Sequence, residues 1–266
     1  MGSSSTNPSS ETLLKVGIVG FGPFGQFLSR TILKQGHLVT ATSQSDHSQL
    51  CSELGITFYR EMDQFCNANN DVILLCPSIL SLSSVLESLR SNRLEKGTLF
   101  VDVLSVKEHP RDLLLNVLPE ECDVLCTHPM FGPESGKDGW SGLPLVFDKV
   151  RIRNESLCMN FLSIFEKEGC RMVEMSCTEH DKLAARSQFL THTIGRILSE
   201  MKIESTLMDT KGFQTLLQLR DNTMKDSLDL YCGLFKHNKF AKQELENLEG
   251  AFHSLKLKLQ ETEDAK

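Results

Sequence analysis

The first two-thirds of the chain alternates short apolar runs with amphipathic stretches. Residues 13–19 are apolar and rich in β-branched side chains, which is typical of a buried parallel strand. A glycine-rich turn and an amphipathic segment over 26–35 follow, and Gly36 ends that segment. Further strands are predicted over 37–43, 71–76, 99–103, 123–127, 146–153 and 171–175. This alternation predicts an α/β fold with a Rossmann-like, doubly wound sheet.

The periodicity changes to helical near residue 176. Ser176 or Thr178 can cap a helix that continues through 181–201, and long helical segments are predicted over 210–235 and 239–261. Apolar faces on such helices are commonly buried in a dimer. We therefore expect a disordered tail over 1–13, a dinucleotide-binding domain over 14–175, and a smaller all-α substrate and dimerisation domain over 176–266, in a homodimer.

Composition excludes several classes of function. The chain has 266 residues, 40% of them hydrophobic, and a net charge of -7, so it has no basic excess with which to bind nucleic acid. Nine cysteines occur without a Cys-x-x-Cys pair, and the closest two are Cys122 and Cys126. This spacing argues against a disulfide framework or a metal site and for reduced, mostly buried thiols.

Targeting signals are not evident in the first residues. Residues 1–12 are rich in serine and contain neither an apolar run nor an arginine. No apolar run approaches the roughly 20 residues that a membrane-spanning helix requires. The sequence therefore predicts a cytoplasmic protein that is not associated with a membrane.

The glycine-rich turn is a candidate cofactor site. Gly20, Gly22 and Gly25 form the pattern G-x-G-x-x-G directly after a predicted strand and at the start of a helix. The first glycine permits a tight turn, the second lets a pyrophosphate approach the backbone, and the third lets helix and strand pack closely. A helix N-terminus also offers free N–H groups to phosphates. We predict a bound dinucleotide; the alternative is a glycine-rich turn without a ligand.

The end of the second predicted strand indicates which dinucleotide binds. Sites that prefer NAD usually place Asp or Glu there, to accept a hydrogen bond from the ribose 2′-OH. This strand is followed by Ser43, Gln44 and Ser45, with no acid before Asp46. Hydroxyl and amide groups can donate to a 2′-phosphate, whereas a carboxylate repels it. NADP is therefore the predicted cofactor, although residue 44 is not the arginine that usually supplies the charge.

Three motifs together resemble a known family. The strand over 123–127 leads into the sequence THPMFGPE over 127–134, with a histidine at the strand's end, and DVLSVK occupies 102–107. With the glycine turn, these resemble the TyrA family, the arogenate and prephenate dehydrogenases of tyrosine synthesis, and the plant branch most closely. The resemblance extends from residue 14 to about 255, and THPMFGPE is its most specific element.

The resemblance implies an NADP-dependent oxidative decarboxylation. A cyclohexadienol ring loses hydride from C4 to the nicotinamide and loses its carboxylate as CO2. His128 matches the family's catalytic histidine, and a neutral imidazole is suited to accept the 4-hydroxyl proton near pH 7. Ser105 matches a serine that hydrogen-bonds the same hydroxyl. The alternatives are a histidine that caps a loop and a serine that caps a helix over 106–116.

The resemblance also indicates the residues that bind the substrate. Gln188 and His192 match pocket positions and share a helical face, and Thr223 and Asp226 form a second same-face pair at i and i+3. Asp226 matches the position that separates the two substrates: a carboxylate would pair with the ammonium of arogenate but not with the ketone of prephenate. Lys242 stands where relatives carry arginine. Exposed surface is the alternative for each pair.

Arogenate is therefore the expected substrate, and prephenate the alternative. Because tyrosine keeps the same ammonium, Asp226 should also make the enzyme sensitive to its product. Two other classes share the layout. The β-hydroxyacid dehydrogenases usually carry a catalytic lysine on a helix of the second domain, and 184–196 contains none. A non-catalytic NADP sensor would need neither Ser105 nor His128.

Overall fold

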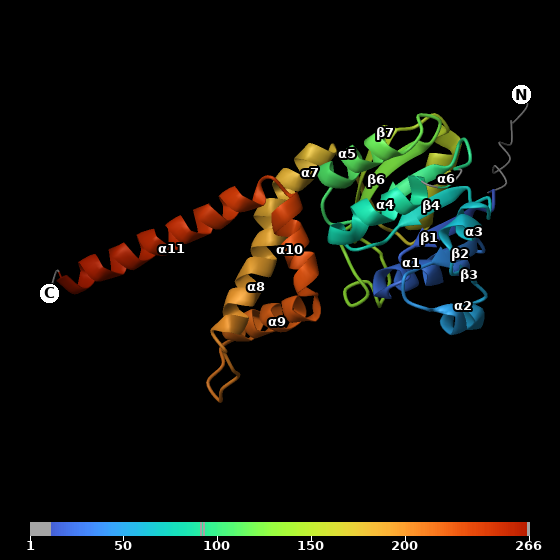
Figure 1. The fold of residues 1–266 in the computed structure, drawn as a ribbon. Helices are drawn as coiled ribbons and strands as arrows, with labels where there is room; N and C mark the ends of the chain where they lie inside the picture. Colours follow the sequence, from blue (N-terminus) through green and yellow to red (C-terminus); the bar gives the residue numbers. More distant parts are fainter. Residues whose placement is uncertain (1–11, 91, 93, 265–266) are drawn as a thin grey trace, which may run out of the picture. The chain divides into compact units, whose positions relative to one another are not determined.

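The computed structural model describes residues 12–90, 92 and 94–264. The tail predicted over 1–13 lies outside the described residues except for Thr12 and Leu13. Two compact units are present: the first comprises residues up to 77, 83–104 and 113–174, and the second comprises 78–82, 105–112 and 175 onward. Each is described below by itself (Figure 1).

The first unit is built on one eight-stranded sheet with the order β3-β2-β1-β4-β5-β6-β7-β8. All neighbouring strands are parallel except β6 and β7, so the carboxyl ends of β1 to β6 meet at one edge. The chain leaves β1 toward β2 on one side and reaches β4 on the other, which makes the carboxyl end of β1 a topological switch point. The strands are β1 Lys15–Val19, β2 Leu38–Thr42, β3 Thr57–Tyr59, β4 Val72–Leu75, β5 Leu99–Asp102, β6 Asp123–Pro129, β7 Pro144–Arg151 and β8 Arg171–Glu174.

Burial explains why the central strands read as uninterrupted apolar runs. Every residue of β4 and β5 is buried, so both faces of the sheet are covered there. The helical segments before residue 170 are α1 Pro23–Lys34, α2 Ser48–Leu54, α3 Met62–Cys66, η1 Ile79–Ser81, α4 Leu82–Arg90, α5 Glu108–Val117 and α6 Glu155–Lys167. Of these, η1 and the first half of α5 belong to the second unit. The predicted α/β, Rossmann-like class is confirmed. Strand β3 was not predicted, because three residues, one exposed and two half-buried, carry too little periodic signal.

The second unit is helical. Its segments are α7 Cys177–Ala184, the π-helical turn η2 Ala185–Phe189, α8 Leu190–Glu200, α9 Lys211–Lys225, α10 Leu228–His237 and α11 Ala241–Asp264. Ser176 caps α7, because its Oγ accepts a hydrogen bond from the backbone N–H of Glu179. In Figure 1, α11 runs away from α8 and α10 after its first turns.

The helix predicted over 210–235 is wrong in one respect: the structure divides it into α9 and α10. Asp226 has extended backbone angles, with φ -80° and ψ 141°, and ends α9. Ser227 begins α10, since its Oγ accepts from the N–H of Leu230 at 3.1 Å. The amphipathic period runs on across the break, and the capping serine is the local feature that marks the start of a new helix.

Residues 105–112 belong to the helical unit because hydrogen bonds join them to it. Glu108 accepts from the Thr178 hydroxyl at 2.6 Å and from the Lys239 ammonium at 2.9 Å. The rings of His109 and His237 have centroids 3.9 Å apart. Burial, with a further contribution from His109, lowers the pKa of His237 to about 4.

Candidate functional site

The glycine turn after β1 has the geometry its sequence predicts. Gly20 has φ +92°, and a Cβ there would lie 2.8 Å from the backbone carbonyl of Cys76. A Cβ on Gly25 would lie 2.5 Å from the carbonyl oxygen of Gly20, so only glycine lets α1 approach the turn. These two residues fix the turn at the switch point of the sheet.

Gly22 differs from its two neighbours in the motif. It is the N-terminal cap of α1, and a Cβ there would meet nothing within 4 Å. Pro23 opens α1, and no side chain caps the helix. The N-terminus of α1 thus faces open space with its N–H groups available, which fits the pyrophosphate of a dinucleotide.

A cation that the sequence did not suggest lies beside the end of β2. Thr42 of β2 is in register with Tyr59 of β3, so residues 43–45 and Arg60 follow these strands at the same edge. Nη1 of Arg60 lies 3.6 Å from Oδ2 of Asp46, and both side chains are about half exposed. Hydrogen bonds from Ser48, and then Arg60, hold the pKa of Asp46 below its usual range. Only the register of β3, a strand that sequence reasoning missed, could have found Arg60.

His128 occupies the end of β6 predicted for it. The residue is 4% exposed and is opposite Val146 of β7. The carboxyl end of β6 lies at the same edge as the glycine turn and three strands away, roughly 14 Å by strand spacing. The Thr127 hydroxyl donates to the Asp102 carbonyl at 2.7 Å and so ties β6 to the end of β5.

Asp181 was not predicted as a functional residue. It caps the start of a helix, which is the role that the sequence analysis gave as the alternative for Ser105. Its fully buried carboxylate accepts hydrogen bonds from the backbone N–H groups of Lys107 at 2.7 Å and Glu108 at 2.9 Å. Nδ1 of His180 lies 2.9 Å from Oδ1 of the same carboxylate. Asp181 therefore stabilises the start of α5, and the hydroxyl of Ser105 is not needed as a cap.

Three polar side chains follow one another along η2 and α8 at four-residue spacing. Gln188 Oε1, His192 Nδ1 and Arg196 Nε are buried and have no hydrogen-bond partner among the residues that the structure describes. A buried polar atom without a partner costs about 1–3 kcal/mol, so such a run indicates a surface that a polar ligand completes. Gln188 and His192 were predicted. Arg196 was missed, although the same spacing continues to it.

Asp226 lies beside this run. Its Oδ2 is 3.8 Å from Nε2 of His192, and its side chain is 48% exposed whereas that of His192 is 9% exposed. Burial lowers the pKa of His192, Asp226 partly offsets this effect, and Arg196 lowers the pKa further. A neutral imidazole and a solvent-accessible carboxylate thus stand side by side, which suits recognition of a cationic group.

The two other predicted residues of the helical unit have different surroundings. The prediction that Thr223 and Asp226 share a helical face is wrong, because α9 ends between them. Thr223 is buried, and a Cβ on Gly195 would lie 2.3 Å from its hydroxyl, so its main contact is the close packing of α8 on α9. Lys242 is exposed on the first turn of α11.

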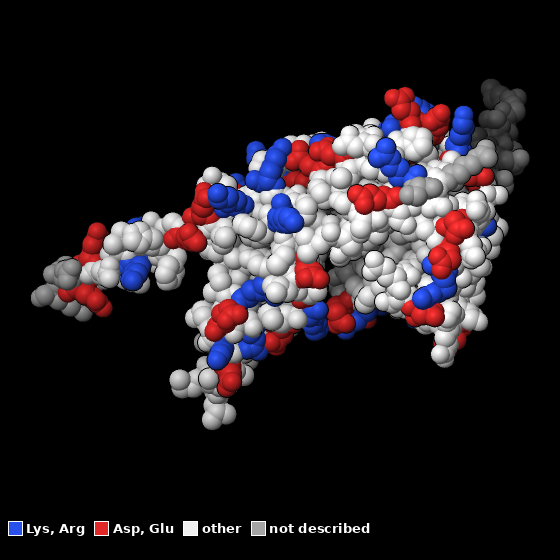
Figure 2. Space-filling view, in the orientation of Figure 1, with Lys and Arg blue, Asp and Glu red and all other residues white. Residues whose placement is uncertain are grey.

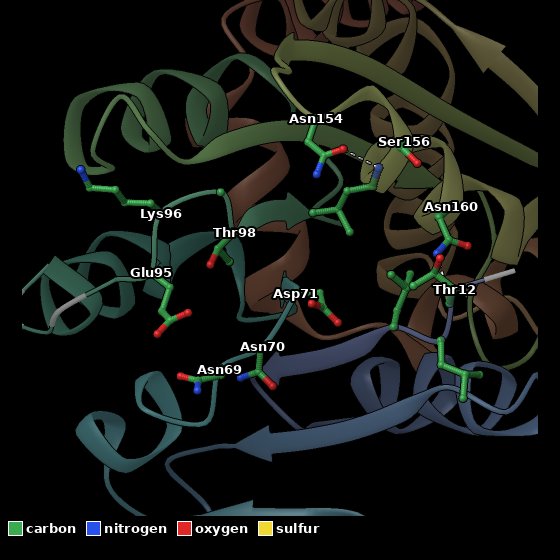
Figure 3. A pocket seen from close by; sticks show the side chains of 14 residues that line it. Thr12, Asn69, Asn70, Asp71, Glu95, Lys96, Thr98, Asn154, Ser156 and Asn160 are labelled. Carbon is green, nitrogen blue, oxygen red and sulfur yellow. Dashed lines mark hydrogen bonds between the residues drawn. The ribbon is translucent and has the colours of Figure 1, made fainter.

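A cavity of about 500 Å³ lies elsewhere, at the amino ends of the strands (Figure 3). Two of its polar side chains already have partners within the protein: Asp71 accepts from the backbone N–H of Lys15, and Asn160 donates to the Thr12 carbonyl. The glycine turn and His128 are at the opposite edge of the sheet. We therefore do not assign the chemistry to this cavity. On the face that Figure 2 shows, acidic and basic side chains are interspersed.

A nucleotide-binding unit with a glycine turn at its switch point, followed by a helical unit, is the arrangement typical of nicotinamide-dependent dehydrogenases. The family described as prephenate dehydrogenase, nucleotide-binding domain, matches residues 28–143, and the one described as TYRAAT1-like, C-terminal domain, matches 197–266. Arogenate dehydrogenase 2, chloroplastic, of Arabidopsis thaliana is 53% identical over 92% of this chain, which spans 70% of that protein. The chain belongs to this family of arogenate and prephenate dehydrogenases, as its sequence motifs predicted.

A further relative belongs to the same family, and two solved structures share the fold. Arogenate dehydrogenase 1, chloroplastic, of Arabidopsis thaliana is 58% identical over 92% of this chain, although the chain spans only 39% of that protein. The solved prephenate dehydrogenase of A. aeolicus in complex with hydroxyphenyl propionate and NAD+ shares the fold, with a TM-score of 0.77, 19% identity, and coverage of 96% of this chain and 94% of that one. Synechocystis arogenate dehydrogenase gives a TM-score of 0.70 at 17% identity, over 94% of this chain and 93% of that one.

The predicted cytoplasmic location is wrong. Both Arabidopsis relatives are named chloroplastic, which points to a plastid. The prediction rested on the first residues of the sequence, and a targeting segment is removable and leaves no mark on the packed domains. Among the described residues, no helix has both the length and the apolar character to cross a bilayer.

Proposed function

We propose that the chain catalyses the NADP-dependent oxidative decarboxylation of arogenate to tyrosine and uses prephenate poorly. The carboxylate of Asp226 beside the buried His192 carries this proposal. Arogenate has a side-chain ammonium where prephenate has a ketone. A carboxylate therefore pairs with the first substrate and is left without a partner by the second. The names of the two Arabidopsis relatives support the same choice.

Five of the predicted residues have a chemical task in this reaction beside that of Asp226. The bound nicotinamide supplies a hydride acceptor for ring C4 of the substrate. His128 accepts the proton of the ring hydroxyl, and Ser105 hydrogen-bonds that hydroxyl. Gln188 and His192 hydrogen-bond the substrate, and because His192 stays neutral near pH 7 it adds no cation beside the ammonium. Lys242 is the candidate partner for a substrate carboxylate.

NADP preference has two supports in the nucleotide-binding unit. Residues 43–45 offer hydroxyl and amide donors, and Arg60 supplies the positive charge that residue 44 lacks. Arg60 pairs with Asp46 only at 3.6 Å and in solvent, so the pair is weak and Arg60 can turn to a 2′-phosphate. NAD has a ribose 2′-OH in place of the 2′-phosphate and would not form an ion pair with Arg60.

We also propose that the protein is a homodimer and that tyrosine inhibits it. On α11, Phe252, Leu255 and Leu259 are 57–70% exposed and recur at heptad spacing, which is typical of a helix that packs on another chain. Tyrosine retains the ammonium that Asp226 binds, so product and substrate compete for the same carboxylate.

The test is the rate of formation of the reduced cofactor, NADPH with NADP and NADH with NAD, measured with arogenate and, separately, with prephenate. The proposal expects kcat/KM for arogenate with NADP to be the highest of the four values. A preference for prephenate would retain the family chemistry and refute the role of Asp226. A faster reaction with NAD would refute the cofactor preference alone.

A further inference from the structure

Arg196 holds the backbone on which Asp226 is mounted. Its Nη2 atom donates to the carbonyl oxygens of both Asp226 and Ser227, at 3.1 Å and 3.0 Å. These are the two residues at which α9 ends and α10 begins. One guanidinium therefore bridges the break between the two helices from a third, α8.

An aromatic platform fixes the guanidinium itself. The guanidinium carbon of Arg196 lies 5.0 Å from the ring centroid of Tyr231 on α10. That ring stacks on Phe189, with centroids 5.5 Å apart and an angle of 6° between the planes, and the Tyr231 hydroxyl is 3.0 Å from the Thr193 hydroxyl. Arginine suits this place because its planar group can stack and donate at once, which lysine cannot.

We propose that Arg196 is a positioning residue for substrate selectivity, which acts through the two carbonyls to hold the Asp226 carboxylate beside His192. This inference rests on the proposed function. An Asp side chain on a free extended linker samples several orientations, and each orientation away from the site loses the pairing with the substrate ammonium. Arg196 removes that freedom. Its effect falls on arogenate, because prephenate has no ammonium for Asp226 to meet.

The experiment is a double-mutant cycle on the ratio of kcat/KM for arogenate to that for prephenate. The four proteins are the wild type, Arg196→Lys, Asp226→Asn and the double variant. We expect Arg196→Lys to lower the ratio about tenfold, mainly through the KM for arogenate, and to change it less than about twofold in the Asp226→Asn background. Arg186→Lys is the matched control, because that arginine on η2 is exposed and forms an ion pair with Glu244 at 3.5 Å.

An unchanged ratio in Arg196→Lys, or an equal fall in both backgrounds, would overturn the proposal. A second pair of variants guards against misfolding. Tyr231→Leu removes the aromatic platform and should also lower the ratio. Tyr231→Phe keeps the ring and should leave the ratio unchanged. Equal ratios in the two variants would count against the proposal. If the wild type turns over neither substrate, the proposed function fails. If the wild type prefers arogenate and Arg196→Lys keeps that preference, only the role of Arg196 is refuted.

Discussion

Oδ2 of Asp226 lies 3.8 Å from Nε2 of His192, although 34 positions separate the two residues in the sequence. One side chain is buried and the other is half exposed. Because the imidazole is kept neutral, the carboxylate has no strong partner among the residues that the structure describes and is available to a cationic ligand. The first prediction follows from this arrangement.

Asp226→Asn should lower kcat/KM for arogenate about tenfold or more and leave that for prephenate equal or higher. The amide cannot pair with an ammonium ion and is neutral toward a ketone. Inhibition by tyrosine should weaken in the same variant. Steady-state kinetics with both substrates provides the measurement. Asp221→Asn is the control, since that carboxylate is exposed on α9 and pairs with Arg220 at 2.7 Å; similar losses in both variants would contradict the prediction.

Two alanine substitutions in the glycine turn should have opposite consequences. Gly22→Ala adds a methyl group where nothing lies within 4 Å, so thermal stability should be retained while the Kd for NADP rises about tenfold. Gly25→Ala places a Cβ 2.5 Å from a backbone oxygen and should lower Tm markedly. Calorimetry of unfolding and titration with NADP separate the two effects. Tight NADP binding by Gly22→Ala would argue against a pyrophosphate at this turn.

Arg60→Gln should weaken NADP binding about tenfold and leave NAD binding unchanged, because only the 2′-phosphate needs the cation. Isothermal titration with each dinucleotide measures this directly, without turnover. Arg90→Gln, at an exposed arginine that ends α4, serves as the control. Equal losses for NADP and NAD would mean that Arg60 acts on the loop and not on the phosphate.

Asp181→Asn should destabilise the helical unit by roughly 2–4 kcal/mol, because a buried carboxylate that accepts two backbone N–H groups is replaced by an amide with one acceptor. Urea denaturation measures the loss. Asp112→Asn changes an exposed carboxylate on the same helix, α5, and should cost little. A full retention of stability by Asp181→Asn would show that the start of α5 is held by other contacts.

Acidification should destabilise the protein through His237. Its pKa is lowered to about 4 in the folded state, below its ordinary value, so the unfolded chain binds the proton first. The stability it contributes is complete above about pH 6.5 and is lost as the pH falls toward 4; after allowance for solvent screening the loss is on the order of 1 kcal/mol. Tm measured from pH 7 to pH 4 should therefore fall less steeply in His237→Gln. A parallel fall in both proteins would assign the effect to other groups.

The sequence predicted the parts of the molecule that depend on local patterns. The glycine turn and the strand that carries His128 near its end were found because turn chemistry and apolar runs are readable within a few residues. Arg196 and Asp181 were missed because their partners lie 30 and 74 positions away and are brought close only by helix packing. The break at Asp226 was missed because the helical period continues through it, and only the capping by Ser227 distinguishes it from an unbroken helix.

The π-helical turn at 185–189 is a place where the helix from α7 to α8 could be changed in length as well as by substitution. Such a turn holds one residue more than an α-helical turn. Removal of a single residue there would restore an uninterrupted α-helix and rotate the preceding residues by about 100° against His192 and everything after it. Loss or gain of one codon in this turn would therefore change which side chains face the substrate. The sequences on either side of the turn would stay the same.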